Sequence, residues 1–200
     1  KLTPFGELCV EINRENTTLL WELIHINLAY NSPLMGWFSS SVGFNTEIGR
    51  KDLDKLALEY FQQTFKETTI TYAVQALVQT FKYSPIGEDL RQFVSQDTKG
   101  TSFQRLPYND LSPEAVAYSL YKYAEQKGIK MLRVSDLYRS EELCGVYREF
   151  GISKGELQKK LRFLSSEKNR VLVAEITMGL DHITLRDDLD QLVVLKSLLQ

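Results

Sequence analysis

The order of the elements expected between Ser112 and Leu185 constrains the fold of this chain more than any other feature. The pattern predicts a helix, a short helical element, a turn, a basic helix and a β-hairpin. Winged helix-turn-helix domains have this order, and many of them place the third helix in the major groove of DNA. We therefore expect a mainly α protein, with a helical bundle over residues 1–97 followed by a winged helix-turn-helix with a β-hairpin wing over residues 111–200.

The basic helix is expected to begin at Ser153, which can cap it, and to continue to about residue 164. Leu157, Leu161 and Leu164 fall on one face at helical spacing and predict a buried side. At about 100° per residue, lysine and arginine side chains lie on the opposite face, with Gln158 at its flank. A helix with one apolar and one basic face can pack on a core while contacting a polyanion.

The charge is local, because the whole chain carries a formal net charge of −2. Between Ser153 and Arg170, six basic residues stand against two acidic ones. Basic residues would contact DNA phosphates, and a glutamine could reach a base edge. The candidate nucleic-acid-binding residues are Lys154, Gln158, Lys159, Arg162, Lys168 and Arg170. The alternative is a winged helix used only for packing or for protein contacts.

Outside this region the sequence predicts further helices, a hairpin and one linker. Capping residues and apolar periodicity predict helices over residues 4–12, 17–29, 52–65, 69–81, 112–128, 141–150 and 187–199. The hairpin is expected to pair residues 170–177 with 182–185. The polar stretch over residues 95–109 is the expected linker between the two subdomains.

The composition is that of an ordinary globular protein, with 43% hydrophobic and 25% charged residues. Cys9 and Cys144 are the two cysteines and are far apart, which argues against a zinc knuckle and favours reduced thiols in the cytoplasm. No run of 18 apolar residues predicts a membrane span. Because the first residue is Lys1 and not Met, we expect a fragment that lacks an N-terminal part.

Catalytic chemistry has few candidates in this sequence. A nuclease would need carboxylates that hold Mg²⁺ or Mn²⁺, and no other cofactor is evident. The acidic clusters are Glu88-Asp89, Glu141-Glu142, and Asp187-Asp188 with Asp190, none with a recognisable nuclease spacing. We expect no metal site, and a solvated or helix-starting role for these acids. His25 is expected to be a hydrogen-bonded core residue, with a catalytic or metal role as the alternative. His182 is expected to be a strand residue of the wing, with contact to a DNA phosphate as the alternative.

Two sets of aromatic residues could either pack in the core or form a binding surface. Core packing is favoured over a stacking platform for single strands for Trp37, Phe38, Phe44, Tyr60 and Phe61. Core packing is also favoured over a partner-docking surface for Tyr118, Tyr121, Tyr123 and Tyr147.

Three short motifs resemble a bacterial family that includes the SspB component of the Ssp DNA phosphorothioation systems. The motifs are Leu2-Thr3-Pro4-Phe5-Gly6, Leu19-Leu20-Trp21-Glu22-Leu23-Ile24-His25 and Tyr83-Ser84-Pro85-Ile86-Gly87-Glu88-Asp89-Leu90. The similarity covers roughly residues 2–90 by motif, and the remainder by general layout. Leu19 and Ser84 depart from the family pattern, the latter standing where we associate a cysteine with the family.

The resemblance implies a DNA-binding component of a bacterial phosphorothioation defence system, as part of a DNA nickase. It implies an ATPase and a sulfur transferase related to PAPS reductases as partners, besides DNA. It transfers no catalytic residue, so the nicking chemistry could lie outside this chain. The rival hypothesis is a non-catalytic adaptor that docks partner proteins, and the sequence leaves homodimer formation open.

Overall fold

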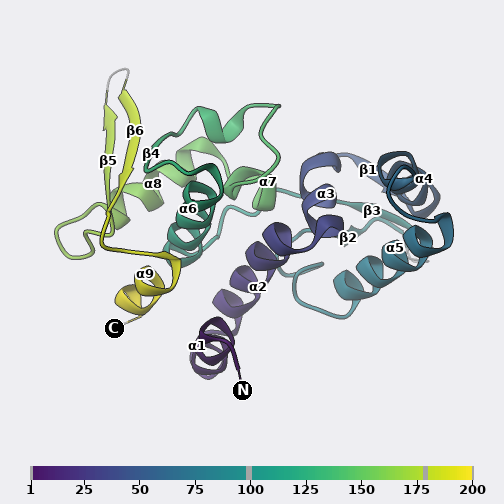
Figure 1. Ribbon diagram of the computed structural model, residues 1–200, viewed down its shortest axis with the longest axis horizontal. Helices are drawn as coiled ribbons and strands as arrows, with labels where there is room; N and C mark the ends of the chain where they lie inside the picture. Colours follow the sequence, from purple (N-terminus) through teal and green to yellow (C-terminus); the bar gives the residue numbers. More distant parts are fainter. Residues whose placement is uncertain (1, 98–100, 178–179, 200) are drawn as a thin grey trace.

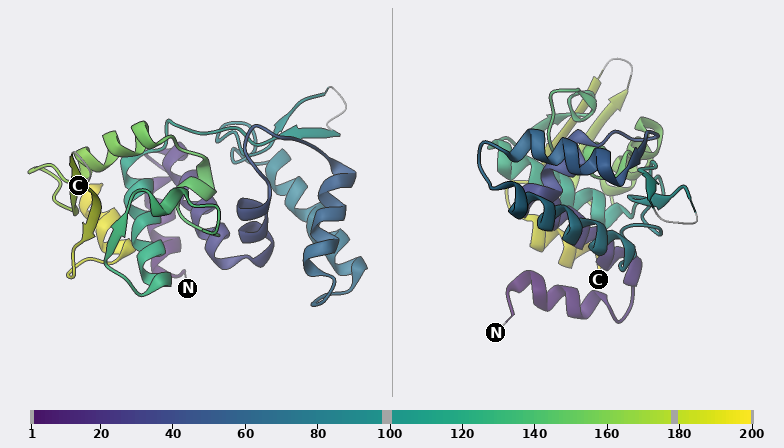
Figure 2. Two further views of the ribbon diagram at one scale, coloured as in Figure 1. Left: turned by 90° about the horizontal axis from the view of Figure 1, so that it is seen from above. Right: turned by 90° about the vertical axis from the view of Figure 1, so that its right-hand side faces the viewer.

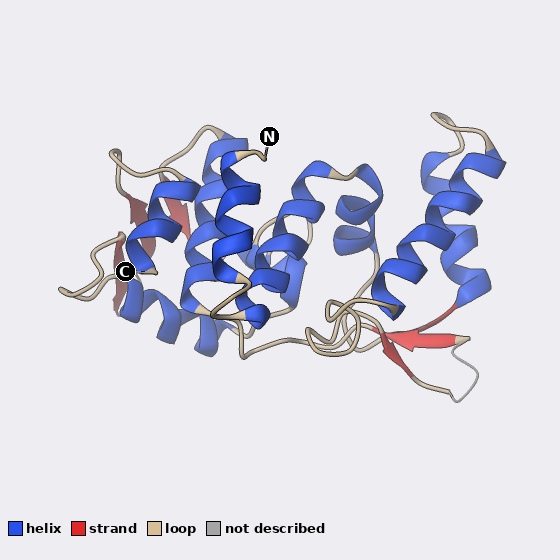
Figure 3. Cartoon of the chain, turned by 90° about the horizontal axis from the view of Figure 1, so that it is seen from below, coloured by secondary structure: helices blue, strands red, loops and turns tan. Residues whose placement is uncertain are grey.

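The chain is mainly helical and carries two small antiparallel sheets. The computed structural model describes residues 2–97, 101–177 and 180–199. Figure 3 shows the two sheets at opposite ends of the molecule. Within the described ranges, no helix is long and apolar enough to cross a membrane.

One end of the molecule is built from two long helices and the first sheet (Figure 1). Its elements are α4 (Arg50–Phe61), α5 (Glu67–Lys82), β1 (Glu47–Gly49), β2 (Val94–Ser95) and β3 (Ser102–Gln104). The strand order is β1-β3-β2, with Ile48 opposite Phe103. Figure 2 shows α4 and α5 side by side, and α3 (Pro33–Ser41) packs against them through Trp37 and Phe38.

Helices α1 (Pro4–Ile12), α2 (Thr17–Asn31) and α3 (Pro33–Ser41) begin where the sequence offers a cap. The Asn16 side chain accepts a hydrogen bond from the amide of Leu19 at 3.0 Å. Ser32 caps α3 in the same way, with Pro33 in the first turn where its missing N–H costs nothing. Helices α1 and α2 lie within about two residues of their predicted bounds, whereas α3 was not among the predicted helices.

The other end contains the region that the sequence singles out. Its elements are α6 (Pro113–Lys127), β4 (Met131–Arg133), a 3-10 turn η1 (Asp136–Tyr138), α7 (Val146–Phe150), α8 (Lys154–Leu164), β5 (Leu172–Thr177), β6 (Leu180–Leu185) and α9 (Gln191–Leu198). The second sheet is antiparallel in the order β4-β6-β5, with Leu132, Ile183 and Ala174 in register. The predicted hairpin is therefore confirmed, although part of its turn lies outside the described residues.

Three elements of this end differ from expectation. Strand β4 was not predicted, because three residues are too short for a recognisable alternation. The helix predicted over 141–150 is only α7, since Gly145 adopts φ 101° and breaks the helix before it. The last helix begins at Gln191 and not at residue 187, because the Asp190 carboxylate accepts from the amides of Leu192 and Val193.

The stretch over residues 95–109 is not a free linker. It carries β3, and Phe103, Arg105 and Tyr108 within it are all buried. The polar composition of this stretch did not indicate that these three long side chains turn inward. The division into two subdomains at this stretch stays a prediction.

Arg105 joins the two ends of the molecule. Its guanidinium donates to the carbonyl oxygens of Ser39 at 3.0 Å and Val42 at 2.8 Å, at the end of α3. It also donates to the carbonyl oxygen of Arg148 at 2.7 Å, in α7. Burial, with a smaller contribution from Arg148, lowers the pKa of Arg105 to about 9, so the group stays charged at neutral pH. One buried cation thus satisfies the carbonyl groups at two helix ends.

Two side chains of α2 fix the position of α6 and α7. The Glu22 carboxylate accepts hydrogen bonds from the amide and hydroxyl of Ser112, the residue that caps α6. His25 donates from Nε2 to the carbonyl oxygen of Glu149 at 3.0 Å. Because α7 leads into α8, these contacts also set where the basic helix lies.

Candidate nucleic-acid interface

The basic helix α8 is amphipathic as the sequence predicts. Ser153 caps it, since its hydroxyl oxygen accepts from the amide of Glu156 at 3.3 Å. Leu157, Leu161 and Leu164 have no exposed surface and pack into the core. Burial of three leucines gives α8 one fixed rotation about its axis, so its basic face has to point outward.

The candidate binding residues lie on the outer side of α8 and on the segment that follows it. Lys154, Lys159 and Arg162 are exposed on the helix, and Gln158 is half-buried at its flank. Lys168 and Arg170 are exposed between α8 and β5. The structure thus brings the candidate residues of one sequence segment to the surface beside the β5–β6 hairpin (Figure 1).

The contacts of these cations within the chain are weak enough to exchange for phosphate. Lys159 pairs with Glu156 at 2.5 Å, and 69% of the lysine side chain is exposed. Exposed pairs of this kind contribute about 0–1 kcal/mol. Lys154 Nζ lies 5.3 Å from the centre of the Tyr138 ring. Arg162 and Lys168 form no ion pair with any described residue.

The hairpin beside α8 has one covered and one open face. Ile183 is buried beneath the sheet, whereas Val173, Glu175 and Thr184 are exposed on the other side. Ser165, directly after α8, accepts from the amide of Ala174 at 3.1 Å and so ties the helix to the edge strand. The hairpin is therefore held in a fixed position next to the basic helix.

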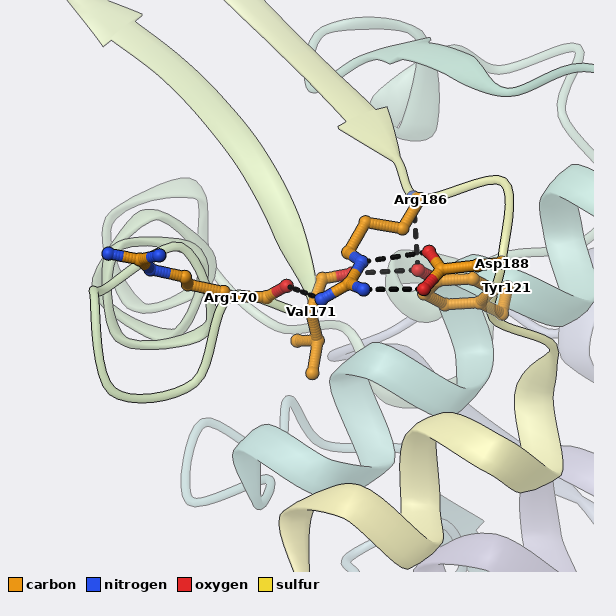
Figure 4. Close-up of polar contacts among 5 residues, drawn as sticks. All are labelled: Tyr121, Arg170, Val171, Arg186 and Asp188. Carbon is orange, nitrogen blue, oxygen red and sulfur yellow. Dashed lines mark hydrogen bonds and ion pairs between the residues drawn. The ribbon is translucent and has the colours of Figure 1, made fainter.

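A polar cluster fixes the base of the hairpin (Figure 4). The buried hydroxyl of Tyr121, on α6, donates to the carbonyl oxygen of Val171 at 2.7 Å and accepts from the amide of Arg186 at 3.1 Å. The Arg186 guanidinium binds both oxygens of Asp188 and donates to the carbonyl oxygen of Arg170 at 3.0 Å. One tyrosine thus holds the start of β5 and the end of β6 to α6.

The acidic clusters have structural partners. Glu142 pairs with Lys127 at 2.9 Å, and Asp187 pairs with Lys130 at 2.5 Å. Glu88 accepts from the amide of Ser95 at 3.3 Å. Among the described residues, no three His, Cys, Asp or Glu side chains are grouped so that they could hold a metal ion. We therefore derive no step through a metal.

The two histidines have the structural roles expected of them. His25 is fully buried, and burial lowers its pKa to about 3, so it is neutral and donates to the Glu149 carbonyl oxygen. His182 is half-buried in β6, with Arg133 and Glu175 as its neighbours across the sheet.

The aromatic sets lie largely in the core. Tyr118, Tyr121 and Tyr123 are buried, as are Trp37 and Phe38. The exceptions are Phe44 and Tyr147, which are half-buried and contact each other, and Tyr60, which is 59% exposed. Core packing is thus confirmed for most of them.

The sequence did not identify the groups that position the interface. Arg105, Glu22 and Glu149 are buried, and Tyr121 was considered only as core or docking surface. An arginine inside a polar stretch and a glutamate inside an apolar helix are signals of low specificity, because most such residues are solvated.

Comparisons with known proteins give a likeness in structure and none in sequence. No known protein family matches the sequence, and no curated protein matches it either. A crystal structure described as magnesium-ion-bound SspB is similar with a TM-score of 0.60 and 14% identity, over 76% of this chain and 49% of that chain. A second SspB crystal structure is similar over the same shares, with a TM-score of 0.59.

This chain spans about half the length of the SspB chains that it matches. At 14% identity the likeness concerns the fold. It confirms the resemblance inferred from the three sequence motifs. Over three quarters of its length, the chain has a fold similar to that of SspB.

Proposed function

We propose that this chain is a DNA-contacting component of a bacterial phosphorothioation defence system. The region from α6 to β6 would act as a winged helix-turn-helix, with α8 as the helix that contacts DNA and the β5–β6 hairpin as the wing. The order α6, β4, α7, α8, β5, β6 and the strand order β4-β6-β5 support this interpretation. The likeness to SspB supports the context.

The observation that carries the proposal is the division of α8 into two faces. Its leucines are fully buried, whereas its lysines and arginine face outward beside a hairpin. Exposed cations on one helix face supply the sequence-independent part of DNA affinity, through phosphate contacts and the release of counterions. Gln158, at the flank of that face, is placed for a base edge.

The proposal assigns DNA contact to the described residues, as part of a DNA nickase whose catalytic residues could lie outside this chain. A nickase that uses Mg²⁺ or Mn²⁺ would hold the ion through carboxylates near the scissile phosphate. The ATPase and the sulfur transferase related to PAPS reductases are the proposed protein partners. The alternative is a non-catalytic adaptor that docks partners through its tyrosines and acidic tail. Of those tyrosines, Tyr118, Tyr121 and Tyr123 are buried, which leaves half-buried Tyr147 and the acidic tail for such a surface.

The test is a DNA titration at two salt concentrations, with wild type and Lys159→Glu/Arg162→Glu. We expect salt-dependent binding that the double variant loses, because it reverses two charges of the outer face. The matched control is Lys51→Glu/Lys66→Glu, which makes the same change in charge at exposed positions on the far end of the molecule. Equal affinity of the two double variants, or absence of binding by wild type, would refute the proposal.

A further inference from the structure

Arg170 has an unusual backbone conformation for an arginine. Its φ is +45°, in the left-handed region that residues with a Cβ avoid. Such a conformation persists only where the surroundings impose it, and an observed outlier of this kind points toward function. Glycine or asparagine would adopt it at lower cost, so the contacts around Arg170 have to hold the backbone in this conformation.

Two backbone hydrogen bonds and one side chain impose this conformation. The amide of Arg170 donates to the carbonyl oxygen of Ser166 at 2.9 Å, and the next amide, of Val171, donates to that of Leu164 at 3.1 Å. The carbonyl oxygen of Arg170 itself accepts from Nη1 of Arg186 at 3.0 Å. The backbone is thus held on both sides of the α-carbon.

Arg186 is itself held in a fixed orientation. Its Nε and Nη2 donate to the two carboxylate oxygens of Asp188, the first at 2.9 Å and the second at 2.5 Å. Its own amide is bound by the Tyr121 hydroxyl. Because the guanidinium is planar and Asp188 holds its Nε–Nη2 edge, Nη1 points in one direction, here toward the Arg170 carbonyl oxygen.

The side chain of Arg170 takes no part in this cluster. Figure 4 shows it pointing away from the Arg186–Asp188 pair. It is exposed and forms no ion pair or side-chain hydrogen bond with any described residue. Its guanidinium therefore stays available for an anion outside the chain, at the junction of the basic segment with the hairpin.

We infer that Arg186 is a positioning residue, which acts with Asp188 to hold Arg170 so that its guanidinium meets a DNA phosphate. This inference rests on the proposed function and adds a specific dependence to it. Arg186 binds the Arg170 main chain and not the DNA, so its effect on affinity passes through Arg170 alone.

A double-mutant cycle tests this dependence. The variants are Arg170→Ala, Arg186→Met and the two combined, titrated with duplex DNA at two salt concentrations. We expect Arg170→Ala to weaken binding by about tenfold and to reduce the salt slope by about 1, as for the loss of one phosphate contact. We expect Arg186→Met to weaken binding by a similar factor, and the combined variant to bind no more weakly than Arg170→Ala.

The matched control is Arg50→Met. Arg50 forms the same two-point pair with Asp54, at 3.0 and 3.1 Å, on α4 at the other end of the molecule. The Arg50→Met variant should leave the affinity for DNA unchanged. Thermal melts of each variant establish a temperature at which all of them are folded, and the titrations are made there. If Arg186→Met is too unstable, Arg186→Lys replaces it. The lysine keeps a donor toward the Arg170 carbonyl oxygen and should recover part of the DNA affinity.

The outcomes separate this inference from the proposed function. Wild-type affinity in Arg186→Met, or a further loss when it is added to Arg170→Ala, overturns the inference, because Arg186 would then be irrelevant or in direct contact with DNA. In that case the proposed function would still hold if wild type binds DNA and Lys159→Glu/Arg162→Glu does not. Absence of DNA binding by wild type refutes both.

Discussion

The carboxyl group of Glu149 should make the stability of this protein fall as pH rises. Glu149 lies on α7 with no exposed surface, and its Oε2 accepts from the Ser119 hydroxyl at 2.7 Å. It forms no ion pair with any described residue. Burial raises its pKa from 4.5 to about 7 against the smaller opposing effect of its hydrogen bonds. The neutral form is therefore the one that the fold favours.

The size of the effect follows from that change in pKa. One pH unit corresponds to about 1.4 kcal/mol, so a rise from 4.5 to about 7 is worth about 3 kcal/mol in total. Because the pKa is higher in the folded chain, the contribution is complete below pH 4.5 and is lost as pH rises through 7. Between pH 5 and pH 8 the loss is roughly 2 to 3 kcal/mol.

The assay compares wild type and Glu149→Gln by urea unfolding at pH 5, 6, 7 and 8. The glutamine keeps an acceptor for Ser119 and does not ionise, so the free energy of unfolding of the variant relative to wild type should rise by roughly 2 to 3 kcal/mol over this range. The control is Glu141→Gln, an exposed carboxyl just before α7, which should keep the wild-type decline. Parallel curves for wild type and Glu149→Gln would show that the buried carboxyl does not titrate as argued.

Three further predictions concern stability and are measured by chemical denaturation. Tyr121→Phe should cost about 1–3 kcal/mol, because the base of the hairpin loses both hydrogen bonds to the hydroxyl; an unchanged midpoint would argue against this role. Arg105→Met should cost about 3–5 kcal/mol, since it leaves several buried carbonyl oxygens without a donor; a loss below about 1 kcal/mol would contradict it. Gly151→Ala should cost about 1–2 kcal/mol, because Gly151 has φ +66° and a Cβ there would lie 2.8 Å from the Phe44 ring; equal stability would refute this.

Much of the helical structure follows from local chemistry and could be predicted. Ser112 before Pro113, Asn16 and Ser153 are caps whose side chains each accept a hydrogen bond from an amide three residues ahead. The leucines of α8 are spaced three and four residues apart, and only a helix places residues at that spacing on one face. The hairpin followed from β-branched residues on both sides of a turn. These signals lie within one segment, so one sequence contains them in full.

Tertiary contacts decided the positions of the elements relative to one another. β4 is three residues long, and it is a strand because β6 offers its free edge to it. The polar stretch that looked like a linker holds β3 and the buried Arg105, whose partners come from residues more than 40 positions away in α3 and α7. No local pattern records such a partner, because a hydrogen bond between distant segments depends on where both are placed.

For the candidate interface, too, some features follow from the sequence and others only from the tertiary structure. The sequence by itself determined that α8 would have a basic face, because charge and periodicity are properties of one segment. Only the tertiary structure decided which way that face points, since the burial of its leucines sets the rotation of α8. The structure also decided that Arg170 would be held by Arg186, because two residues sixteen positions apart meet only when the hairpin closes between them.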